Sequence, residues 1–296
     1  MSKILTNNFY KQRGEFYQQA AVRDETMTFP EGIIEYANIP YAEDGLKEHR
    51  MDIFRPAGRE NEILPVIVNV HGGGLLLGNK EFNRYFCAQL SARGYLVFSV
   101  EHRLVPDVQI YDQFADLSMA MDGIQKLLPK YCGNPDKVYI AGDSGGACLI
   151  VYTIAMQKCT ALADAAHVTP STLPVRALGL ISGMFYTTKF DKIGLFLPPY
   201  LYGKNYKKGD FAPYVNPEHP DIVTALPPCF LVTSHNDFLQ HYTLNFEKAL
   251  TKHGVSHELK NYPKNPKLTH AFSVFEPYME ESEETISLML DFFVRN

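Results

Sequence analysis

The chain has 296 residues, of which 46% are hydrophobic, and a net charge of −5 at pH 7. A chain of this length buries roughly three quarters of the surface that it exposes when unfolded, so one large domain can account for all of it. The charges are scattered and form no basic block, which argues against nucleic-acid binding, and no apolar run approaches the ~18 residues needed to cross a bilayer.

The five cysteines are widely spaced and include no C-x-x-C pair. Such a set is typical of reduced thiols in the cytoplasm. The first residues contain no long apolar stretch of the kind found in signal peptides. We therefore expect a cytoplasmic protein without a membrane span.

Apolar runs typical of buried strands alternate with segments of helical periodicity along most of the chain. Strands are predicted at 33–41, 49–56, 65–70, 95–100, 137–142, 175–182, 228–234 and 257–262. Helices are predicted at 81–94, 114–128, 147–157, 244–254 and 283–294. This alternation predicts an α/β fold with a mostly parallel sheet and helices on both faces, after an antiparallel entry hairpin.

Two segments depart from the alternation. Residues 1–30 are polar and aromatic and are expected to form one or two short helices, and residues 183–225 are rich in Tyr, Pro and Lys. We expect both to form cap elements of a single domain spanning 1–296. The alternative for 183–225 is an ordinary surface excursion, although long loops are often functional.

The sequence GDSGG at 142–146 surrounds a serine between a predicted strand and a predicted helix. The same letters occur around the nucleophile of trypsin-like proteases, but those enzymes are all-β and need the chain order His, Asp, Ser. The strand-turn-helix context instead favours the nucleophile elbow G-x-S-x-G, which presents Ser144 on a sharp turn.

HGGG at 71–74 directly follows a predicted buried strand. Glycines allow backbone N–H groups to approach a substrate closely. Gly73 and Gly74, together with the N–H of Gly145, are suited to hold a developing oxyanion. The alternative is a flexible glycine turn.

The remaining triad members are expected in the order Asp, then His. Asp237 follows the predicted strand 228–234, where a triad acid belongs, although it also suits a helix N-cap. His270 lies on a loop between the last predicted strand and the last helix. His235 and His241 flank Asp237 and are rivals for the role of the base.

The segments HGGG, EHRLVPD, GDSGGA, NDFL and THAF, in this order, resemble the hormone-sensitive-lipase-like branch of the α/β-hydrolase carboxylesterases. The resemblance spans roughly residues 48–296. It implies an α/β-hydrolase fold with an eight-stranded, mostly parallel sheet, a helical cap, and ester hydrolysis without a cofactor or a metal. Carried over by position, it implies Ser144 as nucleophile, Asp237 as acid and His270 as base. It also implies Gly73, Gly74 and Gly145 as oxyanion donors, and Asp143 as support for the loop.

The chain departs from the family pattern at several places. Gly145 replaces an alanine, His102 stands where tyrosine is frequent, Gln240 replaces an acidic residue, and Ala271 replaces a glycine. No triad member is lost by these changes.

The expected function is a carboxylic ester hydrolase acting on small or short-acyl esters, with acetyl esters of sugars among the candidates. A peptidase or amidase on the same triad is one alternative. A non-catalytic small-molecule-binding homologue is another, as in the plant gibberellin receptors, which resemble this branch but lack the catalytic histidine.

Candidate substrate contacts are Leu75, Phe185, Tyr186 and Tyr202. For Leu75, packing in the core is an equally open alternative. The expected partner is a small ester, with no nucleic acid, and a homodimer is left open.

Overall fold

The computed structural model describes residues 2–296 and contains an eight-stranded sheet with the order β1-β2-β4-β3-β5-β6-β7-β8. The strands are β1 (Ile33–Pro40), β2 (Arg50–Pro56), β3 (Leu64–Val70), β4 (Leu96–Val100), β5 (Gly133–Asp143), β6 (Leu178–Ile181), β7 (Cys229–Ser234) and β8 (His257–Tyr262). β2 pairs antiparallel with both β1 and β4, and all the other neighbours are parallel. The predicted fold class, including the entry hairpin, is confirmed.

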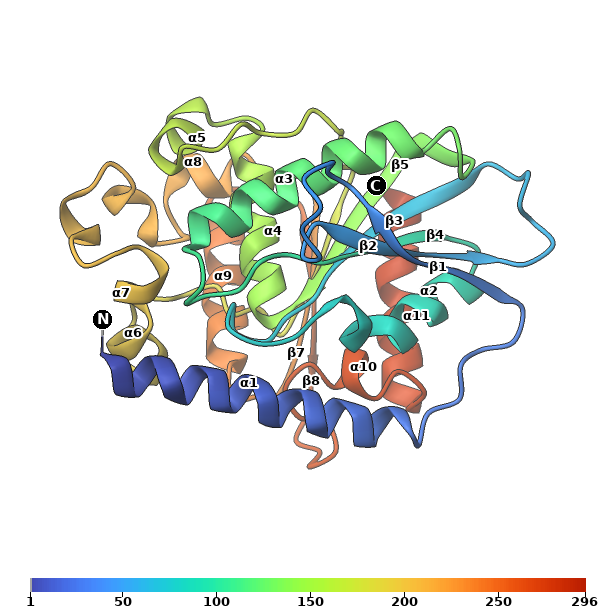
Figure 1. Ribbon diagram of the computed structural model, residues 1–296, viewed down its shortest axis with the longest axis horizontal. Coiled ribbons are helices and arrows are strands. Elements are labelled where there is room, and N and C mark those ends of the chain that lie inside the picture. Colours follow the sequence, from blue (N-terminus) through green and yellow to red (C-terminus); the bar gives the residue numbers. More distant parts are fainter. Residues whose placement is uncertain (1) are drawn as a thin grey trace.

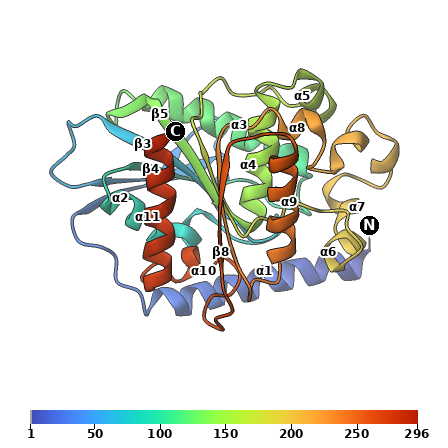
Figure 2. The ribbon, with the colours of Figure 1, turned by 180° about the vertical axis from the view of Figure 1, so that it is seen from behind.

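Helices cover both faces of this sheet (Figures 1 and 2). α2 (Arg84–Ala92) and α11 (Glu280–Arg295) lie on one face, and α3 (Ile110–Leu127), α4 (Ser144–Met156) and α9 (Gln240–Lys252) lie on the other. The shorter helices are α5 (Thr160–Ala166), α6 (Lys192–Phe196), α7 (Pro198–Leu201), α8 (Pro220–Val223) and α10 (Phe272–Phe275). Three 3₁₀ turns complete the set, at Lys80–Asn83, Tyr206–Lys208 and Ala212–Val215.

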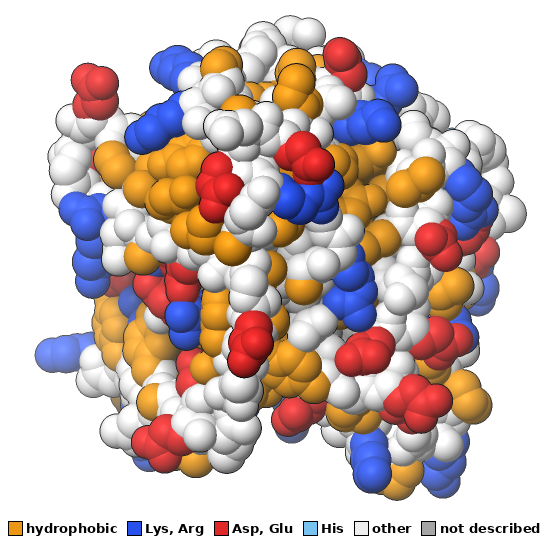
Figure 3. Space-filling view, turned by 90° about the vertical axis from the view of Figure 1, so that its right-hand side faces the viewer, with side chains coloured by type: hydrophobic (Ala, Val, Ile, Leu, Met, Phe, Trp, Pro, Cys, Tyr) orange, Lys and Arg blue, Asp and Glu red, His pale blue; other side chains and the backbone are white. Residues whose placement is uncertain are grey.

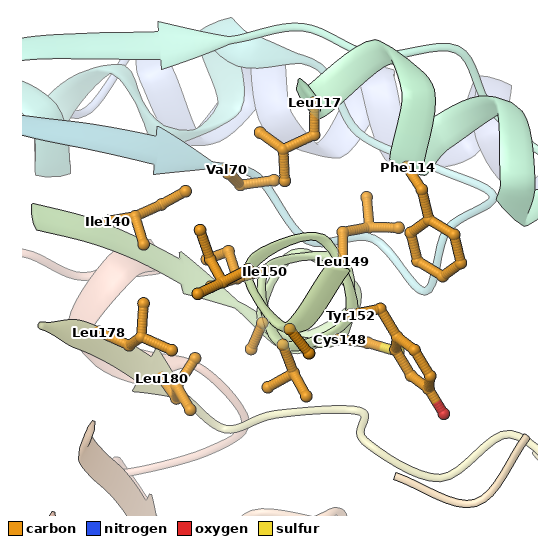
Figure 4. Close-up of a cluster of buried hydrophobic side chains, with 14 of the residues drawn as sticks. Val70, Phe114, Leu117, Ile140, Cys148, Leu149, Ile150, Tyr152, Leu178 and Leu180 are labelled. Carbon is orange, nitrogen blue, oxygen red and sulfur yellow. The ribbon is translucent and has the colours of Figure 1, made fainter. Parts of the chain in front are cut away.

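Two hydrophobic cores follow from the two-residue period of the strands. In β3, Val66, Val68 and Val70 belong to one core and Ile67 to the other, because successive side chains point to opposite faces. Figure 4 shows the larger core around α4, where Ile140, Leu178 and Leu180 of the sheet face Ile150. The helix α4 is buried along its whole length. The serine at its first position therefore sits on a rigid element.

The carboxyl ends of the parallel strands meet at one edge of the sheet. The chain leaves β3 at His71, β5 at Ser144, β7 just before Asp237 and β8 before His270. In open α/β sheets, ligands bind at this carboxyl edge. All the sequence motifs noted above lie at this edge.

The first 30 residues differ from the prediction of one or two short helices. They contain a single 22-residue helix, α1 (Lys3–Asp24), which runs along the carboxyl edge of the sheet (Figure 1). Segment 183–225 contains only short helical turns and follows β6 near the start of α1. Between residues 2 and 296, no helix combines the length and the apolar character needed to cross a membrane.

Candidate active site

Ser144 occupies a strained turn between β5 and α4. Its φ is +49°, in the left-handed region that non-glycine residues rarely adopt, at a cost of about 1–3 kcal/mol. Two glycines near Ser144, Gly142 and Gly146, have no room for side chains. A Cβ at Gly142 would lie 2.6 Å from the carbonyl oxygen of Val70, and one at Gly146 would collide with the same oxygen. The G-x-S-x-G pattern is therefore a steric requirement of this turn.

The segment 71–78, which we call the oxyanion loop after the predicted role of its glycines, passes beside Ser144. Gly73 and Gly74 have φ of +98° and +63° and line the same cavity as the serine. Gly145 packs against this loop so closely that a Cβ would lie 2.9 Å from the backbone nitrogen of Leu75. The three glycines predicted as oxyanion donors are thus brought to one place.

His270 and Asp237 form a hydrogen-bonded pair. The distance between His270 Nδ1 and Asp237 Oδ1 is 2.7 Å. Burial acts to raise the pKa of Asp237, but the hydrogen bond and charge of His270 outweigh it and hold this pKa below its ordinary value. Nδ1 of His270 is thus engaged by the carboxylate and Nε2 is not, and the side chains of His270 and Ser144 line one cavity.

Two further donors hold the Asp237 carboxylate. The N–H of Leu239 donates to Oδ1 at 2.8 Å and the hydroxyl of Thr233 donates to Oδ2 at 3.0 Å. The first bond closes the turn before α9, whose N-cap is Leu239, so Asp237 stabilises this turn without being the N-cap itself, and its role as triad acid stays a prediction. The rival histidines, His235 and His241, have exposed side chains.

Asp143 is fully buried under the oxyanion loop. Its Oδ1 accepts the N–H of Gly72 at 3.0 Å and the side-chain amide of Asn83 at 2.9 Å. Burial raises the pKa of this carboxyl group. The bond to Gly72 agrees with the supporting role that the resemblance implied. Asn83 was not anticipated, since nothing in its local sequence marks it as buried.

A buried histidine pair stands behind the oxyanion loop and was also not anticipated. His71 Nε2 lies 2.9 Å from Glu101 Oε1, and its Nδ1 lies 2.9 Å from the Gly72 carbonyl oxygen. Burial acts to lower the pKa of His71, but the Glu101 carboxylate outweighs it and raises this pKa. His102 stacks on His71 at 4.2 Å between ring centres. Burial and the neighbouring His71 charge lower the pKa of His102 to about 4.

The cavity in front of Ser144 has a volume of about 740 Å³, in the range of small-molecule sites. One wall is a face of α1, formed by Leu5, Phe9 and Phe16 at helical spacing. Most of the other walls are apolar and comprise Leu76, Leu77, Met184, Ile193, Phe196, Leu197, Phe238, Leu239 and Phe275. Asn8, Gln12 and Lys192 are the polar side chains of the lining besides Ser144 and His270.

The four predicted substrate contacts do not lie along this lining. Leu75, Phe185, Tyr186 and Tyr202 are each at most 6% exposed and belong to the larger hydrophobic core. Phe185 stacks on Phe246, the hydroxyl of Tyr186 donates to Glu218 at 2.7 Å, and Tyr202 pairs with Thr187. These residues are buried in the protein interior, so the cavity lining does not support the prediction that they contact substrate. Their neighbours Leu76, Leu77 and Met184 line the cavity instead.

The part of the chain that the structure describes, residues 2–296, contains no group of three or more His, Cys, Asp or Glu side chains arranged to hold a metal ion. All five cysteines have unbridged thiols. Burial raises the pKa of the Cys148 thiol to about 12. This agrees with the place of Cys148 on α4, where its side chain packs in the hydrophobic core.

A family model for the alpha/beta hydrolase fold matches residues 67–273, and the chain belongs to this family. It is similar to a probable isoprenylcysteine alpha-carbonyl methylesterase of Arabidopsis thaliana, with 26% identity over 64% of this chain and 42% of the relative. It is also similar to the carboxylesterase NlhH of Mycobacterium tuberculosis, with 27% identity over 79% of this chain and 74% of the relative. The chain spans about half the length of the plant methylesterases that it matches.

Among solved structures, the chain is similar to esterase B of Lactobacillus rhamnosis, inhibited by a tributyrin phosphonate. The TM-score is 0.92 at 22% identity, and the match covers all of this chain and 96% of the other. At this identity the likeness concerns the fold, and it includes the region of α1.

Proposed function

We propose that this protein is a serine carboxylic ester hydrolase in which Ser144 is the nucleophile, His270 the general base and Asp237 the acid. The observation that carries the proposal is the 2.7 Å contact between His270 Nδ1 and Asp237 Oδ1. The imidazole of His270 also lines the same cavity as Ser144, whose backbone is strained. The esterase names of the relatives support the same reaction.

In the first half-reaction, Ser144 Oγ attacks the ester carbonyl carbon while His270 Nε2 takes the hydroxyl proton. Asp237 holds the imidazole with its proton on Nδ1 and stabilises the imidazolium that forms. The imidazolium then gives its proton to the leaving alcohol, and an acyl-enzyme remains on Ser144. In the second half-reaction, water repeats these steps and releases the acid.

The negative charge of each tetrahedral intermediate falls on the former carbonyl oxygen. We assign its stabilisation to the backbone N–H groups of Gly73, Gly74 and Gly145. The bond from Gly72 to buried Asp143 holds the loop that carries two of these donors. Because the loop is fixed before the substrate arrives, little reorganisation is needed at the moment of reaction.

The cavity favours apolar esters. Its α1 wall extends from Leu5 to Phe16, which corresponds to roughly 17 Å along a helix. This length suits a short to medium acyl chain together with an apolar alcohol, as in the tributyrin-type inhibitor of esterase B. Acetyl esters of sugars are less suited, because the wall offers few groups to bond sugar hydroxyls. We assign α1 and the segment 183–225 as the cap.

The ester reaction is preferred to amide cleavage because the similar proteins named above are esterases. A binding protein without catalysis is less supported, because the base His270 is present and bonded to Asp237. Cytoplasmic location and homodimer formation stay predictions.

The test is hydrolysis of p-nitrophenyl acetate, butyrate and octanoate, with p-nitroanilides as the amide arm. We expect the wild type to turn over the esters, Ser144→Ala to lose at least about 1,000-fold in kcat, and the exposed-serine control Ser287→Ala to match the wild type. Folded wild-type protein that cleaves only the anilides contradicts the ester proposal. Equal activity of Ser144→Ala and Ser287→Ala contradicts the assigned nucleophile.

A further inference from the structure

Three large apolar side chains are exposed within seven residues around α6. Phe190 is 95% exposed, Leu195 54% and Phe196 51%. Phe196 lines the active-site cavity, and Phe190 and Leu195 line an adjacent surface hollow of about 490 Å³. The helix α6 therefore contributes side chains to both hollows.

Lysines surround these apolar side chains. The segment 186–210 contains five lysines and two aspartates, in a chain whose net charge is −5. Lys192 lines the active-site cavity, and Lys189 and Lys207 line the adjacent hollow. We call this combination of Phe190, Leu195, Phe196 and the five lysines (Lys189, Lys192, Lys204, Lys207 and Lys208) the cap surface.

Within the described residues, the five lysines of the cap surface form no ion pair, although Lys189 and Lys207 lie over the rings of Tyr186 and Tyr206. Within residues 2–296, the lysines that pair with a carboxylate lie elsewhere, at positions 11, 47, 80 and 260. The nearby carboxylate of Asp191 is used internally. It accepts the N–H groups of Ile193 and Gly194, both at 3.0 Å, and the hydroxyl of Tyr242.

Other surfaces of the molecule are different. Ile63 and Val294 are 69% and 75% exposed, but they lie on the β2–β3 connection and at the end of α11, far from the cap surface. Figure 3 shows the end of the molecule opposite α6, where acidic and basic side chains are interspersed. The cap surface thus combines an excess of lysines over the aspartates Asp191 and Asp210 with three exposed apolar side chains that lie close together in the chain.

We propose that the cap surface docks the protein onto an anionic lipid–water interface, with the mouth of the active-site cavity at that interface. Aromatic and aliphatic side chains entering the acyl boundary, with lysines at the level of anionic headgroups, form the usual pattern of interfacial binding. The cap surface includes residues that line the active-site cavity, so docking there would bring the cavity close to the lipid. An apolar ester dissolves in lipid, and Phe190 and Leu195 expose apolar surface within seven residues of Phe196, which lines the active-site cavity.

The experiment is flotation of the full chain with vesicles of phosphatidylcholine and phosphatidylserine at 70:30, and with vesicles of phosphatidylcholine alone. We expect binding to the anionic vesicles that weakens as salt is raised. Each lysine near such a surface strengthens binding about fivefold, so Lys204→Gln/Lys207→Gln/Lys208→Gln is expected to weaken it about 100-fold.

The apolar contribution is tested by Phe190→Ser/Leu195→Ser, which leaves the lining of the active-site cavity intact. We expect this variant to lose at least about tenfold in vesicle binding and to retain wild-type turnover of p-nitrophenyl acetate in solution. The matched control, Ile63→Ser/Val294→Ser, removes two apolar side chains elsewhere that are 69% and 75% exposed, and it is expected to bind like the wild type.

Three outcomes overturn the proposal. The wild type fails to bind anionic vesicles, or Phe190→Ser/Leu195→Ser and its control lose binding equally, or the cap surface mediates self-association without lipid that the same variant abolishes. Because the readout is binding, each outcome is independent of whether the protein hydrolyses esters.

Discussion

The guanidinium of Arg13 on α1 donates from Nε to the carbonyl oxygen of Leu76 in the oxyanion loop, at 2.9 Å. The same side chain donates to the carbonyl oxygen of Val105 at 2.9 Å and pairs with Asp107 at 2.7 Å. One turn further along α1, the hydroxyl of Tyr17 donates to the carbonyl oxygen of Gly78 at 3.2 Å. The helix that forms one wall of the cavity is therefore bonded directly to the loop that carries the proposed oxyanion donors.

Arg13→Ala is expected to lower kcat/KM for p-nitrophenyl butyrate by about tenfold. The reason is that two backbone carbonyl groups lose a charged donor, which contributes about 1.5–3 kcal/mol, and α1 loses its attachment to the oxyanion loop. Arg13→Lys is expected to recover little, because an ammonium cannot serve three acceptors in the planar geometry of a guanidinium. Steady-state kinetics checks both, with hydrogen exchange of α1 as the structural readout.

The matched control for Arg13 is Lys11→Ala, a neighbouring cation on α1 whose side chain is 74% exposed. It is expected to leave the kinetics unchanged, since exposed ion pairs contribute little. If Arg13→Ala and Lys11→Ala have the same kcat/KM as the wild type, α1 does not influence the oxyanion loop through this contact.

Asp237→Asn tests the acid of the proposed triad. The amide cannot fix the imidazole with its proton on Nδ1 as the carboxylate does, and kcat is expected to fall about 10³–10⁴-fold. The turn before α9 is expected to survive, because the side-chain oxygen can still accept the N–H of Leu239. Kinetics with circular dichroism checks this, and Asp136→Asn, at an exposed position of β5, is the control. A drop of less than tenfold in Asp237→Asn rules out Asp237 as the acid.

Much of the fold could be predicted from the sequence, because buried strands are continuous apolar runs and two of them are followed by glycine-rich motifs. The runs before HGGG and GDSGG became β3 and β5. Gly142 and Gly146 are explained by their close approach to the carbonyl oxygen of Val70, and Gly73 by its close approach to the carbonyl oxygen of Leu77. Asp237 and His270 were found because the chain order of a triad and the ends of parallel strands narrow the choice. Their contact at 2.7 Å agrees with that reasoning, while their chemical roles stay predictions.

The cap was predicted less well, for a physical reason. Tyr186 and Tyr202 look like surface aromatics in sequence, yet each hydroxyl finds a partner inside the cap, at Glu218 and Thr187. Which tyrosine faces a cavity depends on contacts far apart in the chain. The spacing of Leu5, Phe9 and Phe16 was a signal for one continuous helix, but the polar residues between them obscured it.

Gly145→Ala tests the close contact between the elbow and the oxyanion loop. An added Cβ would lie 2.9 Å from the backbone nitrogen of Leu75 and 3.2 Å from its side chain. Since the backbone of Leu75 must shift, we expect a loss of about 1–3 kcal/mol in the free energy of unfolding and lower kcat. Chemical denaturation and kinetics check this. Gly146→Ala, whose Cβ would collide with two carbonyl oxygens, is expected to be more severe, and the reverse order contradicts the argument.

His102 makes the stability of the fold depend on pH. In the folded protein its pKa is lowered to about 4 by burial and by the charge of His71, whereas in the unfolded chain it is about 6.5. Between these values the unfolded state binds more protons, so the stabilisation is fully present above about pH 6.5 and is lost as the pH falls toward 4. The loss is on the order of 3 kcal/mol.

The measurement is the free energy of unfolding of the wild type and of His102→Phe between pH 4 and pH 8. The phenyl ring keeps the stack on His71 but does not titrate. We expect the advantage of the wild type over His102→Phe to be largest above pH 6.5 and to shrink as the pH is lowered. His235→Phe replaces an exposed histidine and is expected to follow the wild type at every pH. A constant difference between His102→Phe and the wild type across this range would mean that His102 binds a proton equally well in the folded and the unfolded chain.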